Sequence, residues 1–189
     1  MRIIAGIHRG RKLIGPEGTE TTRPITDRVK QSMFDRLAAV DAVDGAVVLD
    51  LFSGTGSMGL ECLSRDAEHV VFVERDRDAR KKLGENLALL RETDRATVLG
   101  CDALGGLLLT SLGRRDFTLV FCDPPYRFMT EIPDRVYEQI GRLADVCISG
   151  ATLILRMQRD VAVSPVQPWG QPQSFVYGSM ALHHFTLGG

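Results

Sequence analysis

Short apolar runs alternate with stretches of helical periodicity along the chain, and this alternation limits the possible folds more than any other feature. The runs are rich in Val, Ile, Leu and Phe, as are parallel strands buried on both faces. Strands that alternate with helices form a mostly parallel sheet with helices on both faces. The sequence therefore predicts an α/β fold with strands at 46–51, 69–74, 97–99, 117–122 and 152–157, and a closing hairpin at 174–177 and 180–185.

Helices are expected between these strands, at about 26–40, 57–65 and 76–90, in a segment ending near 112, and around 136–143. Thr26 is a suitable cap for the first helix. Its apolar stripe consists of Val29, Met33, Leu37 and Val40. Arg28 and Lys30 are expected to lie off this stripe, free to meet a phosphate or water.

The length and the charge distribution predict a single domain, 1–189, with a basic amino-terminal arm. A chain of 189 residues can bury roughly 70% of its unfolded surface in one core. Residues 2–7 and 11–14 predict a short β-hairpin around 8–10, giving an arm at 1–25 and a core at 26–189. Residues 1–36 carry a net charge of +4, whereas the whole chain carries −1. This asymmetry suggests a polyanionic partner for the arm, although a solvated charged surface is the alternative.

Cysteine and histidine usage indicates a cytoplasmic protein without a metal. The four cysteines have no Cys-x-x-Cys spacing and are expected to be reduced. The histidines lack ligand spacing, so no metal is predicted. No signal core is present, and no apolar run approaches the ~18 residues of a membrane helix, so no membrane association is expected. Trp169, among several prolines, is expected to cover the core.

The stretch Asp123-Pro124-Pro125-Tyr126 follows directly after the apolar run 117–122. Asp123 would lie at the carboxyl end of a central strand, where ligands bind in open α/β sheets. The two prolines fix φ and remove two backbone donors, which leaves rigid carbonyl acceptors beside an aromatic ring. A carboxylate, a carbonyl and a flat ring together suit a planar amine. The alternative is a simple turn in which the aspartate caps and the tyrosine packs.

The glycine pattern Gly54-x-Gly56-x-x-Gly59 is compatible with two cofactors. It matches the dinucleotide fingerprint, so an NAD-type dehydrogenase is one interpretation. Asp50 at the preceding strand end argues against it, because a carboxylate would oppose a pyrophosphate. S-adenosylmethionine has no phosphate and carries an ammonium group and a sulfonium, which a carboxylate would attract. The loop therefore favours S-adenosylmethionine, with S-adenosylhomocysteine as the product.

Two more acids follow the next two predicted strands. Glu74 is placed to accept hydrogen bonds from ribose hydroxyls, and Asp102 from the adenine amine. Helix capping or solvent exposure is the alternative for each. Because parallel strands end at one edge of a sheet, acids at three successive strand ends predict a shared binding site.

The pattern Asp50-x-Phe52-x-Gly54-x-Gly56, together with Asp123-Pro124-Pro125-Tyr126, resembles the class I S-adenosylmethionine-dependent amino-methyltransferases. Three further stretches, at 2–6, 9–13 and 22–28, are similar to the RsmD family, which methylates N2 of one guanine in 16S ribosomal RNA. The resemblance covers most of the chain and weakens from about Gln158. Two positions depart from the family pattern: Ile25, where a threonine is usual, and Arg156, where a glutamate is expected.

The resemblance implies a Rossmann-like fold and transfer of a methyl group by direct displacement. Asp123 and the Pro124 carbonyl would hold the amine, and Tyr126 would stack on an extruded base. The expected catalytic residues are Asp123, Pro124, Pro125 and Tyr126. The expected cofactor-binding residues are Asp50, Phe52, Gly54, Gly56, Glu74, Asp102 and Ala103.

The basic arm would hold phosphates of 16S ribosomal RNA, free or within the small-subunit ribonucleoprotein. The expected RNA-binding residues are Arg9, Arg11, Lys12, Arg23 and Arg28. We expect the protein to act as a monomer. A DNA amino-methyltransferase acting on adenine N6 or cytosine N4 is the alternative, but it usually needs a target-recognition region, and this chain offers only short loops.

Overall fold

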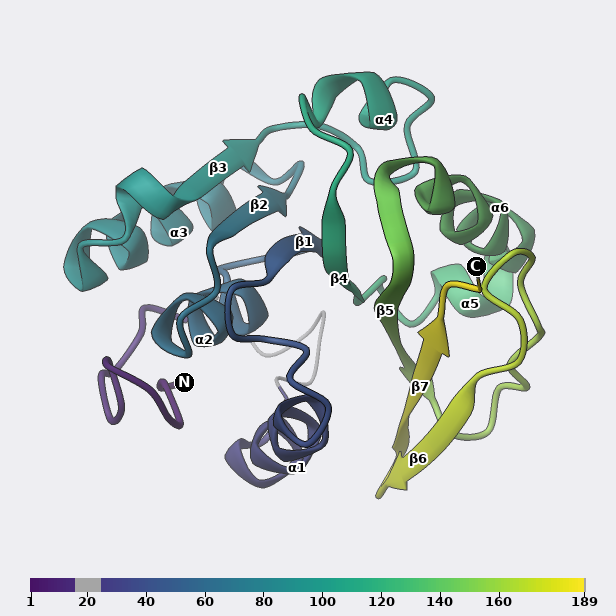
Figure 1. Ribbon diagram of the computed structural model, residues 1–189, viewed down its shortest axis with the longest axis horizontal. Coiled ribbons are helices and arrows are strands. Elements are labelled where there is room, and N and C mark those ends of the chain that lie inside the picture. Colours follow the sequence, from purple (N-terminus) through teal and green to yellow (C-terminus); the bar gives the residue numbers. More distant parts are fainter. Residues whose placement is uncertain (16–24, 189) are drawn as a thin grey trace.

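The computed structural model describes residues 1–15 and 25–188. A seven-stranded sheet with the order β3-β2-β1-β4-β5-β7-β6 forms its centre (Figure 1). Strands β1 to β5 pair in parallel, and β7 pairs antiparallel with both β5 and β6. The strands are β1 (Val47–Leu51), β2 (His69–Val73), β3 (Ala96–Leu99), β4 (Phe117–Cys122), β5 (Cys147–Gln158), β6 (Gln173–Tyr177) and β7 (Met180–Thr186). The predicted mostly parallel sheet and its closing hairpin are confirmed.

Helices connect the strands at α1 (Asp27–Ala38), α2 (Ser57–Ser64), α3 (Arg77–Leu90), α4 (Leu108–Ser111), α5 (Phe128–Glu131) and α6 (Pro133–Leu143). Thr26 caps α1 as predicted, because its hydroxyl accepts from the Val29 N–H at 3.4 Å. The predicted stripe is wrong at Val40, which lies beyond the end of α1 and is exposed. The sequence analysis does not predict α5, a four-residue helix just after the proline corner. None of the helices in the described part of the chain has the length and apolarity that a membrane crossing requires.

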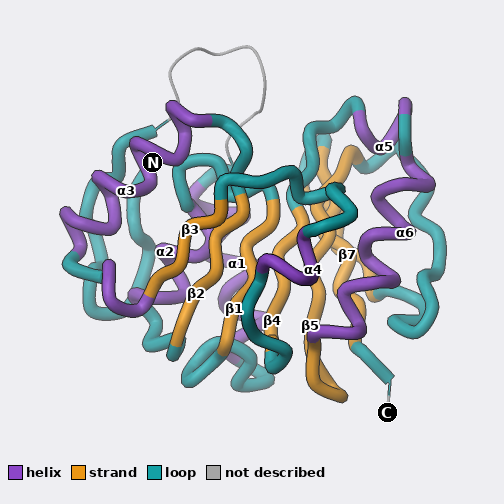
Figure 2. Tube along the Cα trace, turned by 90° about the horizontal axis from the view of Figure 1, so that it is seen from above, coloured by secondary structure: helices purple, strands orange, loops and turns teal. Residues whose placement is uncertain are grey.

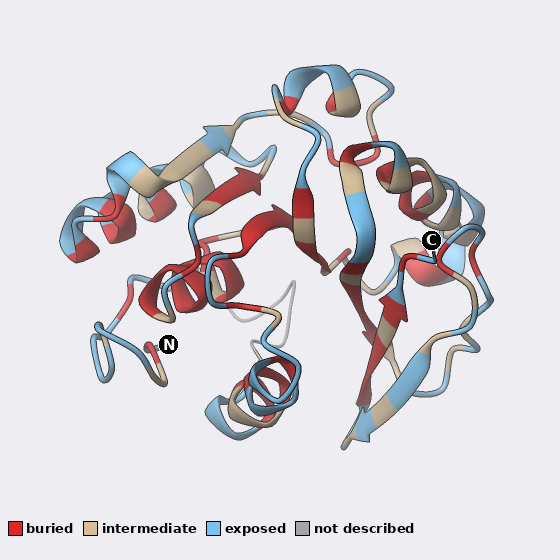
Figure 3. Cartoon of the chain, viewed as in Figure 1, coloured by how far each residue is buried: buried red, intermediate tan, exposed pale blue. Residues whose placement is uncertain are grey.

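The core lies in two layers, one on each face of the sheet. Alternate residues of a strand point to opposite faces. Leu49 and Leu51 of β1 therefore pack with α4, α5 and α6, whereas Val48 packs with α1, α2 and α3. Figure 1 shows α1 and α2 on one side of the sheet and α4 and α6 on the other, and Figure 2 shows α4 in front of the strands. Buried residues are concentrated in the central strands (Figure 3).

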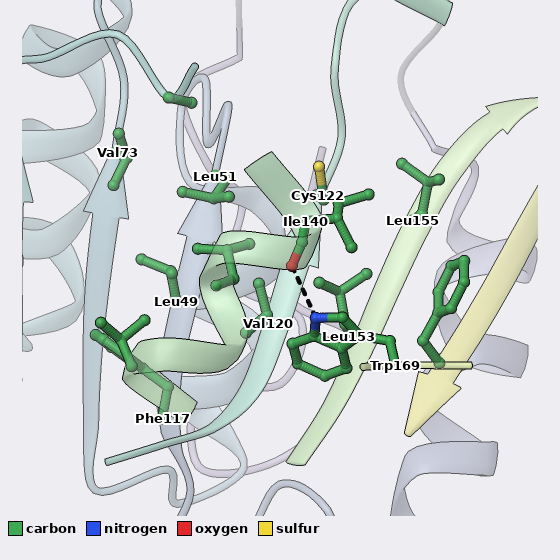
Figure 4. Packing of buried hydrophobic residues seen from close by; sticks show 14 of the residues in the cluster. Leu49, Leu51, Val73, Phe117, Val120, Cys122, Ile140, Leu153, Leu155 and Trp169 are labelled. Carbon is green, nitrogen blue, oxygen red and sulfur yellow. Dashed lines mark hydrogen bonds between the residues drawn. The ribbon is translucent and has the colours of Figure 1, made fainter. Parts of the chain in front are cut away.

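Trp169 covers the core, as the sequence predicts. The residue is 2% exposed, and its indole N–H donates to the Ile140 carbonyl at 2.7 Å. Figure 4 shows the ring beside α6, near Val120 and Leu153. A buried indole N–H needs an acceptor, and the carbonyl in α6 supplies it.

The amino-terminal arm differs from the prediction, because its two halves do not form strands. They still pair antiparallel through a bridge between Arg2 and Lys12 and through backbone hydrogen bonds, such as that from the Ile3 N–H to the Arg11 carbonyl at 3.0 Å. The N–H groups of Ile4 and Ala5 donate to the Glu61 carboxylate of α2, at 2.8 and 3.0 Å. The arm therefore keeps its hairpin pairing and is held against α2 by these further contacts.

The expectation that Lys30 is free to meet phosphate or water is wrong. Lys30 is 2% exposed, and its ammonium group lies 2.8 Å from the Glu61 carboxylate. Residues four and seven positions along a helix share a face, so Lys30 lies on the same face as Phe34 and Leu37. Burial lowers the pKa of Lys30, and the charge of Glu61 opposes this shift. The ion pair thus joins α1 to α2 inside the core.

We predict that Glu61→Gln lowers the free energy of unfolding by about 3–5 kcal/mol, the cost of leaving one member of a buried ion pair without its partner. Urea denaturation measures this change. The matched control is Asp27→Asn, which breaks the exposed Arg2–Asp27 pair and should cost no more than about 1 kcal/mol. Equal losses in the two variants would contradict the structural role of Glu61.

Candidate active site

A cavity of about 560 Å³ opens where β1 to β4 end. Asp50, Glu74, Asp102 and Asp123, the four acids that the sequence places at or after strand ends, all line it. Parallel strands deliver these side chains to the same edge of the sheet. Within residues 1–15 and 25–188, no three His, Cys, Asp or Glu side chains come close enough together to hold a metal ion.

Asp50 is the most buried of these acids, with 2% exposure. One of its carboxylate oxygens accepts from the Gly59 N–H at 2.9 Å. Burial raises the pKa of Asp50 to about 7; the Gly59 hydrogen bond opposes the shift, and the charges of Asp123 and Glu74 increase it. A cation placed beside Asp50 would favour its ionised form, so this end of the cavity suits a positively charged group.

Glu74 and Asp102 line the cavity and also cap local turns. The two oxygens of Glu74 accept from the N–H groups of Gly54 and Asp76, both at 2.8 Å. Asp102 accepts from the Leu104 N–H at 3.0 Å. Each carboxylate oxygen has more than one acceptor site, so these acids can still bind a ligand's hydroxyl or amine.

The glycine loop lines the cavity and also allows α2 to pack closely against its neighbours. Gly54 lines the cavity, together with Phe52 and Ala103. Gly56 is the one predicted cofactor residue that does not line it. Gly56 has φ of 89°, and a Cβ there would lie 2.4 Å from the Leu83 side chain, so this position needs glycine to start α2 against α3. A Cβ at Gly59 would lie 2.3 Å from the Phe72 ring.

Two serines that the sequence reasoning missed also line the cavity. The hydroxyl oxygens of Ser53 and Ser57 are buried and have no hydrogen-bond partner among the described residues. Buried polar atoms are nearly always paired in native proteins. These hydroxyls therefore indicate a polar ligand in the glycine loop. Their only sequence signal was their position between the loop glycines.

The Asp123-Pro124-Pro125-Tyr126 corner is only partly turned towards the cavity. Asp123 follows β4, and its N–H donates to the Leu51 carbonyl of β1 at 3.4 Å. Asp123 and Pro125 line the cavity, whereas Pro124 and Tyr126 do not. The Tyr126 hydroxyl is buried without a partner in the described part of the chain. Stacking of Tyr126 on a base remains a prediction.

Arg156 is a site residue whose role the sequence did not reveal. Its Nε donates to a carboxylate oxygen of Asp123 at 2.6 Å, and its side chain is 7% exposed. Leu155 of β5 pairs with Cys122 of β4, so Arg156 comes next to Asp123. Burial raises the pKa of Asp123, and Arg156 opposes this shift by charge and hydrogen bonding. Only the register between β4 and β5 brings the two residues together.

None of the predicted RNA-binding residues that the structure describes lines the cavity. Arg9, Arg11 and Lys12 are exposed on the arm, and the arm reaches the cavity through Met1. Arg28 is exposed on α1 and lines a separate hollow of about 790 Å³ beside the β6–β7 turn. Arg23 lies outside the described residues.

The fold and the line of acids at the strand ends define a Rossmann-like methyltransferase. The chain belongs to the family described as Conserved hypothetical protein 95, whose model matches residues 1–166 and which is the RsmD family. The Ribosomal RNA small subunit methyltransferase D of Escherichia coli K12 is 39% identical over 146 residues, which cover 77% of this chain and 70% of the relative.

Solved structures support the same fold. The Escherichia coli protein yhhF has a TM-score of 0.81 at 30% identity, with 100% of this chain and 98% of that chain covered. An RNA methyltransferase from Salinibacter ruber, solved in complex with S-adenosyl-L-homocysteine, has a TM-score of 0.61 over 88% of this chain and 94% of that chain. Its identity of 16% limits that comparison to the fold.

We predict that Asp50 makes the protein less stable as the pH rises. The folded pKa of about 7 lies above the unfolded value of ~3.9, so the folded state binds more protons between these values and stability falls as pH rises through this window. Between about pH 4 and pH 8, wild type should lose on the order of 4 kcal/mol more than Asp50→Asn. Denaturant unfolding at several pH values measures this difference. Replacement of the exposed Asp44 by Asn is the control, and it should leave the wild-type pH dependence unchanged.

Proposed function

We propose that this protein uses S-adenosylmethionine to methylate the exocyclic N2 amine of a guanine in 16S ribosomal RNA. The observation that carries the proposal is that Asp123 and Pro125 line the same cavity as Asp50, Glu74 and Asp102. One cavity thus joins a cation-binding end to an amine-binding corner. The Escherichia coli relative, named as a methyltransferase of small-subunit ribosomal RNA, supports the choice of substrate.

The cavity residues fit this cofactor, which supplies a methyl group on a cationic sulfur. Asp50 can hold the ammonium group of the methionine end, because a cation offsets the cost of ionising a buried carboxyl. Glu74 can accept from the ribose hydroxyls, and Asp102, beside Ala103, can accept from the adenine amine. The buried hydroxyls of Ser53 and Ser57 offer further hydrogen bonds. The expected product is S-adenosylhomocysteine.

Asp123 and the prolines after it would hold the guanine amine. The lone pair of this amine is delocalised into the ring, which makes it a poor nucleophile. Acceptance of its two N–H bonds by Asp123 and the Pro124 carbonyl would localise the lone pair and aim it into the cavity. Most of the acceleration would come from this positioning. Asp123 is also placed to take the proton that the nitrogen loses after methylation.

The exposed arm would provide affinity for the RNA backbone. Arg9, Arg11, Lys12 and Arg28 can contact phosphates, and Arg23 is proposed from the sequence alone. Such contacts position a nucleic acid without reading its bases. Tyr126 would then stack on the extruded guanine. We further propose that the protein acts as a monomer in the cytoplasm, on free RNA or on the small-subunit ribonucleoprotein.

We predict that Asp123→Ala abolishes methyl transfer and leaves S-adenosylhomocysteine binding within about threefold of wild type, because Asp123 acts on the amine and not on the cofactor. Transfer of labelled methyl to small-subunit RNA, free and assembled with proteins, measures the first effect, and mapping of the modified base identifies the target. Calorimetry measures the second, and NAD serves as the comparison ligand. An active Asp123→Ala enzyme would refute the role of Asp123. Preferential binding of NAD would favour the dehydrogenase, and transfer to DNA but not RNA would favour the DNA alternative.

We predict that a combined Arg9→Gln, Arg11→Gln and Lys12→Gln variant binds RNA more weakly and with less salt dependence. Each lost phosphate contact should reduce the slope of log affinity against log salt by about 0.7–0.9. The matched control replaces Arg77, Lys81 and Arg115, which are exposed and line neither cavity, with Gln. This control removes the same charge and should retain the wild-type slope. Identical behaviour of the two variants would show that the arm has no specific role.

A further inference from the structure

Arg156 contacts Asp123 in the proposed reaction site. It is the one residue of its strand that lines the cavity. Arg156 lies near the end of β5 and lines the cavity together with Asp123. Its Nε donates to Oδ1 of Asp123 at 2.6 Å. The guanidinium carbon lies 5.9 Å from the centre of the Tyr126 ring. One side chain thus contacts the proposed amine acceptor and the ring proposed to stack on the base.

The surroundings of Asp123 show why a cation beside its carboxylate matters. Among the described residues, the titratable and charged groups around it include Cys122 on its own strand, Asp50 on β1, Arg127 after the proline corner and Arg156 on β5. Burial raises the pKa of Asp123, and Arg156 opposes this. A protonated Asp123 would offer a donor where the amine needs an acceptor. A carboxylate that can rotate would also aim the lone pair poorly.

We propose that Arg156 is a positioning residue for methyl transfer: it holds the Asp123 carboxylate ionised through Oδ1 and thereby presents Oδ2 to the substrate amine. This inference rests on the proposed function. The planar guanidinium suits the task, because its charge is permanent and its donors have a fixed direction. The contact with Tyr126 places the same group beside the ring, so the acceptor and the stacking face are fixed together.

The test is the pH dependence of methyl transfer in Arg156→Met and Arg156→Lys. In Arg156→Met, kcat should fall about 100-fold, as expected for loss of alignment, whereas the S-adenosylhomocysteine Kd should stay within about twofold of wild type. The acidic limb of the pH profile should move to higher pH, because Asp123 loses the charge that keeps it ionised. Arg156→Lys should restore the limb towards the wild-type position and recover kcat only in part, because lysine supplies charge without the planar fork.

The control is Arg159→Met, which removes an exposed arginine paired with Asp160 just beyond the end of β5. This variant should keep wild-type kcat and the wild-type pH profile. Wild-type kcat and an unmoved acidic limb in a folded Arg156→Met enzyme would overturn the proposal. A rise in the Kd for cofactor or the KM for RNA, with kcat unchanged, would also overturn it, because Arg156 would then serve binding and not the acceptor.

A measurement that needs no activity separates this inference from the proposed function. Carboxyl carbon NMR of aspartate-labelled protein can follow the titration of Asp123, which Asp123→Asn identifies by loss of its signal. The Asp123 pKa should be higher in Arg156→Met than in wild type. An unchanged titration would overturn the proposal even in an active enzyme. A higher pKa in a protein that methylates no RNA would place the failure in the proposed function.

Discussion

The structure is organised around a concentration of carboxylates at one edge of a parallel sheet. Four acids at or after strand ends line a single cavity there, and the most buried of them, Asp50, has its pKa raised to about 7. Backbone N–H groups bond to Asp50, Glu74 and Asp102, and Arg156 pairs with Asp123. For Asp50 and Asp123, whose pKa values burial raises, these partners offset only part of the cost of burying the charge. A cationic ligand beside Asp50 would offset more, which supports the proposed sulfonium cofactor over a pyrophosphate.

A second buried ion pair, between Lys30 and Glu61, lies where the arm docks on α2. Glu61 binds Lys30 of α1, Arg65 of α2 and two N–H groups of the arm. The arm reaches the cavity rim through Met1. The elements that build the core therefore also fix the position of the basic residues proposed to contact RNA. Docking of the arm and shaping of the cavity are linked through α2, which carries Glu61 and also Gly59, the hydrogen-bond donor to Asp50.

The predicted strands and main helices were confirmed because their signals are local. An apolar run, a cap such as Thr26 or a proline corner acts through neighbouring residues. The errors arose where distant contacts prevailed. The arm forms no regular strands and bonds to Glu61 in addition to its own pairing. Lys30 is buried in the core because Glu61 of the facing helix α2 pairs with it. Gly56 is needed for packing against Leu83, and its contact with a cofactor stays a prediction. The position of Glu61 relative to the arm and α1 cannot be predicted from the local sequence of either segment.

The sequence by itself determined the parallel sheet, the acids at its strand ends and the rigid corner after Asp123, because each follows from short-range periodicity or from the stereochemistry of glycine and proline. Only the tertiary structure decided which charges meet. Arg156 and Asp123 are 33 positions apart, and their contact exists because β4 and β5 pair in one register. The physical reason is that strand register is a collective property of the packed sheet, whereas an ion pair depends on a few ångströms between two side chains.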